Sequence, residues 1–387
     1  MQNYCEIQKG YELNILTLSP VHWSYLRQRY QHIALGLARK GYSVLYLQIT
    51  HFDPNNVPVL FTILPSIKRI GERLSVLNIF IPVPFHNKPE TVHDVFGLSF
   101  LKFYLRYLRF TPDVAIFGTP YFAFFLPFLK SMGTKIIYDC VDEMTAFPNV
   151  NNNLQASLME RYMVKNSTFT FAASKILYSK ILKLNPNCFY VPNGVDFPHF
   201  FSASKVREKI PEVEHLKHSI VGYIGAVFEW FDVDLVCKLA RLHPDYSILL
   251  VGPVDFSLKK KLEGYLNIKM VGAKPYEVLP RYLACMDVCL IPFKINRLTS
   301  ASNPIKLYEY LAAGKPVVST ALPEVCENAS GLVYIAKDSE DFIRKVEEAV
   351  KEAESPNKEL IMRRIKFAKE NSWEKRIETI EKLLRCG

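Results

Sequence analysis

The sequence predicts an α/β fold made of two doubly wound domains. Short apolar runs alternate with amphipathic segments along the whole chain, which is the pattern of parallel strands connected by helices. This pattern stops at the turn-rich stretch "VPNGVDFPHF" and then begins again. A chain of 387 residues also exceeds the usual size of one domain, so two hydrophobic cores are expected.

The first domain, residues 1–202, opens with a βαβ unit: strand 13–19, helix 25–41 ending at Gly41, and strand 42–49. Its remaining predicted strands are 74–81, 113–118, 135–140, 168–174 and 188–193, and its remaining predicted helices are near 97–110, 153–166 and 175–184.

The second domain, residues 203–370, begins with a strand that enters a glycine turn at 219–226. A helix at 232–242 and strands at 246–253, 267–273, 287–293 and 315–320 follow. From residue 338 onward the sequence is helical and charged, and 371–387 forms the last predicted helix, with Ser372 and Glu374 as its start signal.

Composition narrows the class of protein. Hydrophobic residues make up 49% and charged residues 22%, as in ordinary globular proteins. The eight cysteines form no CxxC pair, so we expect them to be reduced, in a cytoplasmic protein. We find no secretory leader and no apolar stretch of about 18 residues, and therefore expect a chain that is neither secreted nor integral to a membrane.

The formal net charge is +10, and residues 1–200 carry +7 of it, from 19 Lys and Arg against 12 Asp and Glu. Such an excess suits nucleic acid, a membrane surface or a small anionic ligand, and charge alone does not choose among them.

The stretch "SNPIKLYEYLAAGKPVVS", residues 302–319, is the most informative motif. Asn303 is expected to be the N-cap of a helix of about ten residues, Pro304 its first residue and Gly314 its stop. Lys306 lies in the first turn, where the helix end already attracts a diphosphate. Glu309 lies on the same side, and its carboxylate suits the two hydroxyls of a ribose. A plain i,i+3 ion pair between the two is the alternative.

This stretch resembles the donor-binding segment of the GT-B glycosyltransferases. "SPVHWSYLRQRYQHIALGLARKGYSVLYL", "VPNGVD", "VGYIGAVFEWFDVDLV" and "LPRYLACMDVCLIPF" are similar to other parts of the same family. The nearest likeness is to bacterial cell-surface polysaccharide transferases of the teichuronic acid and xanthan glucuronosyl types.

The resemblance implies two Rossmann-like domains facing across a cleft, with C-terminal helices packing back toward the first. It also implies transfer of a sugar from a nucleoside diphosphate donor, UDP-linked by preference, to a glycan or lipid-linked acceptor. No cofactor and no metal ion are expected. The nine histidines form no HxxxH or HxH set, which agrees with that expectation.

One position departs from the family pattern. Many retaining members carry a Glu eight residues before the ribose-binding one, whereas this chain has Ala301 there. The departure favours an inverting reaction, which needs a carboxylate to accept the proton of the acceptor hydroxyl. Asp142 is the expected base, with Asp139 and Glu143 as weaker acceptor-side candidates. Capping of the next helix is the alternative for this acidic group.

Further donor contacts are expected at Gly225, where backbone approaches phosphate, at Tyr276 beside the base, and at Asn303. His22 and Arg29, near the first loop, are weak candidates for acceptor or phosphate contact. A histidine in the core and an arginine on the surface are equally ordinary explanations for His22 and Arg29.

The segment "FLKFYLRYLRF" combines cations with aromatics, with Lys102, Arg106 and Arg109 at helical spacing and Phe103 beside them. This combination is typical of a helix that contacts anionic lipid, which would place the protein on the inner face of the plasma membrane. Buried aromatics with a solvated basic edge give the same pattern.

The sequence also disfavours some classes of protein and leaves others as alternatives. A nucleotide-dependent dehydrogenase or kinase is disfavoured because the chain has neither GxGxxG nor a complete phosphate loop. A nucleic-acid partner is not expected. The alternatives kept are a GT-B epimerase or phosphorylase, and a non-catalytic subunit that binds sugar nucleotides in a membrane polysaccharide assembly complex.

Overall fold

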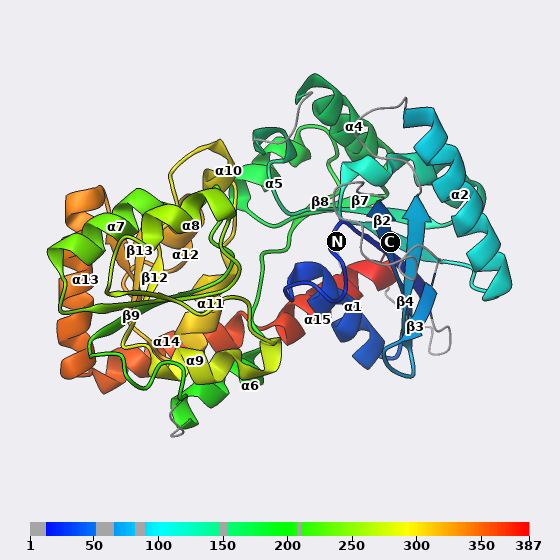
Figure 1. Cartoon of the computed structure of the whole chain (residues 1–387). Coiled ribbons are helices and arrows are strands. Elements are labelled where there is room, and N and C mark those ends of the chain that lie inside the picture. Colours follow the sequence, from blue (N-terminus) through cyan, green and yellow to red (C-terminus); the bar gives the residue numbers. More distant parts are fainter. Residues whose placement is uncertain (1–12, 52–65, 82–89, 148–152, 207–209, 387) are drawn as a thin grey trace. The chain divides into compact units, whose positions relative to one another are not determined.

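The computed structural model describes residues 13–51, 66–81, 90–147, 153–206 and 210–386 (Figure 1). The chain divides into two compact units. Unit 1 comprises Met1–Val191 and Ile377–Gly387, and unit 2 comprises Pro192–Arg376. Each unit is a mainly parallel sheet covered by helices, so the expected α/β class is confirmed.

Unit 1 contains, in its described residues, an eight-stranded sheet in the order β3-β4-β2-β1-β5-β6-β7-β8. Its strands are β1 (Asn14–Ser19), β2 (Ser43–His51), β3 (Ser66–Arg69), β4 (Leu74–Ile81), β5 (Val114–Phe117), β6 (Lys135–Cys140), β7 (Phe169–Ala172) and β8 (Cys188–Tyr190). Its helical segments are α1 (Arg29–Arg39), α2 (Glu90–Tyr107), η1 (Pro120–Phe125), α3 (Leu126–Ser131), η2 (Met144–Ala146), α4 (Asn153–Asn166) and α5 (Lys175–Leu182).

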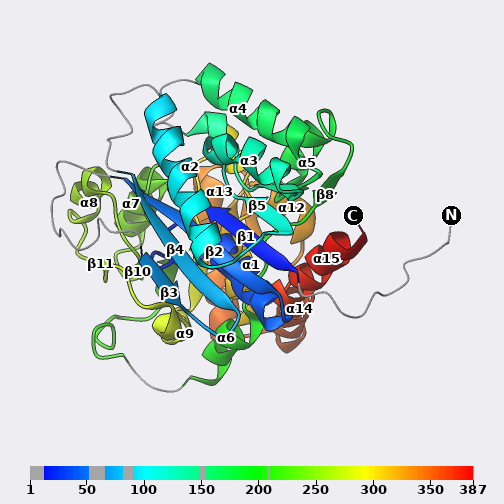
Figure 2. The same cartoon turned by 90° about the vertical axis from the view of Figure 1, so that its right-hand side faces the viewer.

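The strand order of unit 1 reverses at β1, which pairs with β2 on one side and β5 on the other. Because right-handed crossovers put connections that run in opposite directions on opposite faces, α2, α3 and α4 cover one face and α1 covers the other. Figures 1 and 2 show this arrangement, with α15 (Trp373–Cys386) on the same side as α1. Ligands of such folds bind beyond the carboxyl ends of the strands near the reversal.

Unit 2 contains, in its described residues, a six-stranded sheet in the order β11-β10-β9-β12-β13-β14. Its strands are β9 (Ile220–Ile224), β10 (Ser247–Val251), β11 (Ile268–Met270), β12 (Val288–Ile291), β13 (Val317–Thr320) and β14 (Tyr334–Ala336). Its helical segments are α6 (Phe197–Phe201), η3 (Ser202–Lys205), α7 (Val233–Leu242), α8 (Phe256–Leu262), η4 (Tyr276–Val278), α9 (Leu279–Cys285), α10 (Arg297–Ser300), α11 (Ile305–Ala312), α12 (Pro323–Asn328), α13 (Ser339–Glu354) and α14 (Lys358–Glu370). The order reverses between β9 and β12, and all of its pairings are parallel.

The division between the units differs from the expected boundary after residue 202. The chain first passes from unit 1 to unit 2 after Val191, because α6 and η3 pack into the core of unit 2 through Phe200 and Ala203. The chain returns to unit 1 within α15, after Arg376 rather than after residue 370.

The last part of α15 returns to unit 1, as expected for the C-terminal helix. A side chain at Gly36 of α1 would place its Cβ 2.4 Å from Ile377, so the glycine lets the two helices approach closely. Tyr42 donates a hydrogen bond to Glu381 and further ties α15 to unit 1.

Several elements were not predicted, among them the short helices α3, α8, α9 and α12. β3 is an antiparallel edge strand with every residue exposed, and therefore has no apolar alternation to reveal it. β14, at the other sheet edge, has only three residues. Helix α1 begins at Arg29 rather than at residue 25. No helix in the described part of the chain is long and apolar enough to cross a membrane.

Candidate functional site

The predicted helix in residues 302–319 is α11, and its ends lie close to the expected residues. Gly314 adopts φ = 72°, the left-handed conformation that stops a helix. At the other end, Pro304 is the N-cap in extended conformation and Ile305 is the first helical residue. The expected cap at Asn303 is therefore wrong by one position, and Asn303 caps nothing.

Lys306 and Glu309 form an ion pair at the start of α11. Lys306 Nζ donates to Glu309 Oε2 over 2.6 Å, and the side chains are 21% and 3% exposed. The predicted placement of Lys306 in the first turn, with Glu309 one turn further on the same side, is present, and the ammonium is the more exposed of the two groups. The i,i+3 ion pair given as the alternative is therefore present and is partly buried. The contacts of the two side chains with a diphosphate and a ribose stay predictions.

Gly225 follows β9 at the reversal of the unit 2 sheet, where ligands of this topology bind. A Cβ at this position would lie 2.5 Å from the buried Tyr223 hydroxyl, and a Cβ at Gly252 would lie 2.0 Å from the Gly225 carbonyl oxygen. The two strand-end glycines therefore bring two backbone segments together. Gly252 was not singled out, although the "VGP" after β10 is a comparable signal.

Tyr276 opens η4, and one face of its ring is covered from within unit 2. His199 stacks on it with ring centroids 4.3 Å apart, and His199 Nε2 donates to the Tyr276 carbonyl oxygen over 2.9 Å. The contact anchors the loop 271–280 to α6. The predicted contact of Tyr276 with a base stays a prediction.

Asn303 points into unit 2 rather than toward the helix end. It is 4% exposed, and its Nδ2 donates to Glu324 Oε2 over 2.7 Å. Its Oδ1 accepts from the Asn193 backbone N–H over 3.2 Å, and its carbonyl oxygen accepts from Asn193 Nδ2 over 2.6 Å. A direct donor contact by this side chain does not fit this geometry, because its polar atoms are buried against protein groups.

In unit 1, Arg29 and Asp139 form a buried bidentate ion pair. Arg29 Nε donates to Oδ2 of Asp139 over 2.8 Å and one terminal nitrogen donates to Oδ1 over 2.7 Å, with side chains 1% and 0% exposed. The expected contact of these residues with acceptor or phosphate does not fit this burial. The pair holds the first turn of α1 against the end of β6, because unpairing either charge here is costly.

Asp142 lies two residues beyond β6 and is half-buried. Burial raises the pKa of its carboxyl to about 6, with Arg29 lowering it and Asp139 raising it. Its backbone carbonyl accepts from the Cys140 thiol, and within the described residues its carboxylate makes no hydrogen bond. A carboxylate with a pKa near neutrality and open hydrogen-bonding capacity suits a general base.

Glu143, one residue further, is used structurally. Lys180 donates to both of its oxygens at 2.9 Å and also to Glu160 at 2.6 Å, while Thr145 donates to Glu143 at 2.6 Å. These contacts attach η2 to α4 and α5. The weak expectation of an acceptor contact does not fit a carboxylate that is buried and paired in this way.

His22 follows β1 and both of its ring nitrogens have partners. Nε2 lies 3.2 Å from the Ile49 carbonyl oxygen, which only accepts, and Nδ1 lies 3.3 Å from Gln48 Nε2, which only donates. The Gln48 amide is oriented by the Trp23 N–H, which donates to Oε1. The neutral tautomer with a proton on Nε2 therefore satisfies both contacts, and His22 orders the loop after β1.

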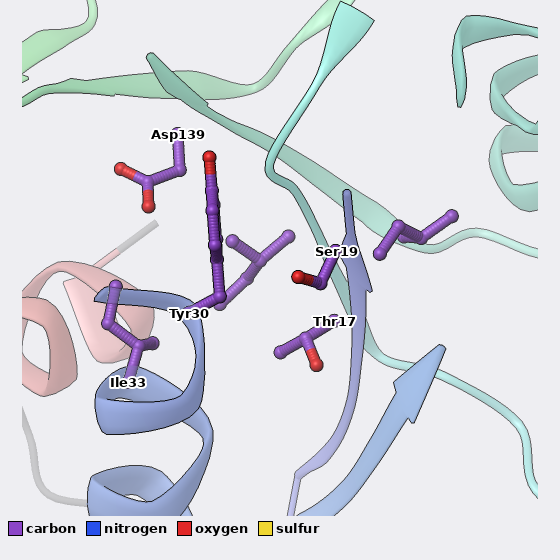
Figure 3. A pocket seen from close by; sticks show the side chains of 7 residues that line it. Thr17, Ser19, Tyr30, Ile33 and Asp139 are labelled. Carbon is purple, nitrogen blue, oxygen red and sulfur yellow. The ribbon is translucent and has the colours of Figure 1, made fainter. Parts of the chain in front are cut away.

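A small cavity lies between α1 and the strands β1 and β5 (Figure 3). Its volume of about 10 Å³ is at the lower limit for one water molecule and far too small for a sugar or nucleotide. It is lined by Thr17, Leu18, Ser19, Tyr30, Ile33, Ile116 and Asp139. Tyr30 extends from α1 toward Asp139, and its hydroxyl donates to the Gly118 carbonyl oxygen.

The cation-rich helix of the sequence is the second half of α2. Phe103 and Tyr107 are 60% and 69% exposed and stack on each other, and Lys102 and Arg106 are exposed beside them. Arg109 follows the helix end in a left-handed conformation with φ = 50°. The buried residues of this segment are Leu101 and Leu105, and Phe103 and Tyr107 are the aromatic residues of the segment that are exposed in unit 1.

No group of three or more His, Cys, Asp and Glu side chains within the described ranges is arranged to hold a metal ion. The residues that sequence reasoning missed are the buried partners of Asn303. Asn193 lies in the "VPNGVD" stretch and Glu324 in "ALPEVCEN", and both have polar side chains next to apolar runs, which was the available signal.

Comparison with known proteins finds a family model that matches most of unit 2. Residues 218–352, which include Gly225, Tyr276 and α11, match the model described as glycosyl transferases group 1. A curated relative from Bacillus subtilis, named as a teichuronic acid biosynthesis glycosyltransferase (TuaH), is 28% identical over 245 residues. That match covers 58% of this chain and 61% of the relative, so the chain spans less than two thirds of TuaH.

Solved structures extend the likeness to almost the whole chain. Sucrose-phosphate synthase from Thermosynechococcus elongatus is similar with a TM-score of 0.76 and 14% identity, covering 96% of this chain and 98% of the other. HepE from Anabaena, in complex with UDP and glucose, is similar with a TM-score of 0.68 and 13% identity, covering 96% and 98%. The chain therefore has the GT-B fold, and residues 218–352 of unit 2 match the glycosyl transferases group 1 model.

Proposed function

We propose that this protein transfers a sugar from a UDP-sugar to a glycan or lipid-linked acceptor in cell-surface polysaccharide synthesis. The observation that carries the proposal is the pairing of Lys306, in the first turn of α11, with Glu309 one turn further, within the residues that match the family model. The UDP and glucose bound to HepE and the teichuronic acid assignment of TuaH support the donor and the pathway class.

In this proposal the amides of the first turn of α11 and the Lys306 ammonium bind the diphosphate. Lys306 neutralises the charge that develops on the departing UDP, so the reaction needs no metal ion. Glu309 accepts hydrogen bonds from the ribose hydroxyls and, by pairing with Lys306, keeps the ammonium at the helix end. Gly225 admits the phosphates close to the backbone.

The proposed reaction inverts the anomeric carbon. Asp142 takes the proton of the acceptor hydroxyl as its oxygen attacks the sugar carbon, and UDP leaves from the opposite face. Ala301 supports this course because it leaves no carboxylate at the position where many retaining relatives have one.

The donor is tested by thermal melting with UDP-, GDP- and dTDP-sugars. A UDP-sugar is expected to raise the melting temperature most, because only the folded protein binds it. UDP is then expected to be released only when a saccharide or lipid-linked saccharide acceptor is added. Release of UDP only in the presence of an acceptor excludes an epimerase or phosphorylase, and donor binding with neither transfer nor hydrolysis across a range of acceptors indicates the non-catalytic subunit.

We also propose that unit 1 contacts an anionic membrane surface through α2. Its exposed cations and aromatics are complementary to anionic headgroups and the interfacial region. Helix α4 lies in the same helical layer and exposes Leu154, Leu158 and Tyr162 with the basic residues Arg161 and Lys165. The exposed apolar side chains of α4 therefore extend the same chemistry beyond α2.

We expect the double variant Phe103→Ser and Tyr107→Ser to cosediment about tenfold less with vesicles of anionic lipid than the wild type does. Added salt should weaken binding of the wild type, because the Lys and Arg contribution is electrostatic. Phe256→Ser is the matched control: Phe256 is 77% exposed beside Lys260 on α8 of unit 2. Equal loss in both variants, or equal wild-type binding to neutral vesicles, contradicts the proposal.

A further inference from the structure

Four polar residues, three of them buried and Arg376 partly buried, connect the start of α11 with both places where the chain passes between its units. Asn193 is the second residue of unit 2, Arg376 is its last, and Asn303 immediately precedes the N-cap of α11. Glu324, in the first turn of α12, completes the set. We call these residues the Asn193 network.

The contacts of the network are specific. Asn193 contacts Asn303 twice, through its backbone N–H and through its side-chain amide, over 3.2 and 2.6 Å. On its other side, the Asn193 carbonyl oxygen accepts from Arg376 Nε over 3.1 Å. Asn303 in turn donates to Glu324. The chain of hydrogen bonds therefore runs from α12, past α11, to the last residue of unit 2.

The two crossing segments are also joined directly to each other. The backbone N–H of Val195 donates to the Asn371 carbonyl oxygen over 3.2 Å, and the backbone N–H of Trp373 donates to the Val195 carbonyl oxygen over 2.9 Å. The segments 192–195 and 371–376 consequently form one hydrogen-bonded piece, and Asn193 is where this piece meets the residue before α11.

We propose that Asn193 and Asn303 are positioning residues that couple diphosphate binding at the start of α11 to the two segments through which the chain passes between its units. This inference rests on the proposed function, because it needs the donor diphosphate to bind at α11. Asn193 does not touch the donor in this scheme.

The physical reason is that buried hydrogen-bond networks have few alternative arrangements. Each polar group that shifts must find another partner or remain unsatisfied away from water. A diphosphate that orders the first turn of α11 therefore orders the Asn303 carbonyl and side chain, and with them Asn193. Such coupling is reciprocal. If diphosphate binding makes opening of the crossing segments less favourable by a given factor, opening of those segments weakens diphosphate binding by the same factor.

The experiment compares the wild type with Asn193→Ala, using UDP as the ligand. Removing the Asn193 amide leaves the Asn303 carbonyl oxygen without that donor, and we expect the dissociation constant for UDP, measured by calorimetry, to rise about 5- to 30-fold. In the wild type, UDP should slow hydrogen exchange at the Val195 and Trp373 amides. In the variant at saturating UDP, this slowing should be lost.

The matched control is Asn267→Ala, in the same unit. Asn267 Nδ2 also holds backbone carbonyl groups, those of Ala240, His243 and Tyr246, but lies outside the network. This control should melt at a lower temperature than the wild type and still bind UDP with unchanged affinity. Arg376→Leu removes the other end of the network and replaces Asn193→Ala if that variant does not fold.

The outcomes separate the two proposals. If the wild type does not bind UDP, the proposed donor site is wrong and the coupling is overturned with it. If the wild type binds UDP but Asn193→Ala binds it equally well and shows the same slowed exchange, the coupling alone is overturned. An affinity loss of the same size in Asn267→Ala also overturns it, because the effect is then one of general stability.

Discussion

Lys306→Ala is expected to lower kcat about 10²- to 10⁴-fold with the fold retained. The ammonium lies in the first turn of α11, where it adds a full charge to the partial charge of the helix end. In the proposed reaction, the leaving diphosphate has no other cation in the first turn of this helix, and loss of a preorganised charge of this kind costs several kcal/mol of transition-state stabilisation. The measurement is the initial rate of acceptor-dependent UDP release.

The same substitution removes the partner of a carboxylate that is only 3% exposed. We therefore expect a loss of about 1–3 kcal/mol in the free energy of unfolding, since the Glu309 charge is left unpaired. Adding Glu309→Gln to Lys306→Ala should recover most of that stability and none of the turnover. This double variant separates the chemical role of Lys306 from its structural role.

A matched control is available in the same unit. Lys345 and Glu348 form another i,i+3 pair, with Nζ and Oε2 2.7 Å apart, on α13. Lys345→Ala should leave turnover unchanged. If Lys306→Ala turns over at the wild-type rate, or if Lys345→Ala loses as much activity, the assignment of Lys306 to the departing diphosphate is wrong.

Asp142→Asn is expected to lower kcat about 10²- to 10⁴-fold, because the amide has the shape of the carboxyl but accepts no proton. The pKa of about 6 also sets the pH dependence of the wild type. The carboxylate is the active form, so the rate should fall as pH decreases through about 6 and reach a plateau above it. The pH profile of kcat/KM measures this directly.

The stability of the folded wild type should fall as pH rises through the same range in which its rate rises. Burial raises the pKa of Asp142 from 3.8 to about 6, so the folded chain holds its proton more tightly than the unfolded chain does. Ionisation therefore costs stability as pH rises between about 4 and 6. Asp142→Asn should melt at a higher temperature than the wild type at pH 8, and the difference should shrink below pH 5.

Asp113→Asn provides the control for the base. Asp113 precedes β5, at the amino end of the strands, and accepts a hydrogen bond from the Asn14 backbone N–H over 2.8 Å. That variant should keep both the wild-type rate and the wild-type pH profile. A rate for Asp142→Asn within a few-fold of the wild type would assign proton transfer to another group.

Local sequence signals were sufficient for much of the fold. Strands β1, β2, β4 and β6 coincide closely with the predicted apolar runs, because a strand buried on both faces of a parallel sheet is apolar along its length. Gly314 also stops α11 as predicted, since few other residues adopt its left-handed conformation easily.

The candidate site was only partly predictable. Lys306 and Glu309 are three residues apart on one helix, so their spacing alone brings them together. By contrast, Arg29 and Asp139 are separated by 110 residues, and both were expected to meet a ligand. The local sequence around each residue does not indicate that the two side chains will form an ion pair in the interior of unit 1.

The sequence by itself determined the alternation of elements, the restart after residue 200 and the composition of the first turn of α11, because each depends on neighbours a few residues apart. Tertiary structure alone decided that Asn303 faces Asn193 and Glu324, that Glu143 pairs with Lys180, and that Asp142 keeps an unpaired carboxylate among the described residues. The reason is that burial and hydrogen-bond partners are set by distant segments, and these determine which polar side chains remain available for chemistry.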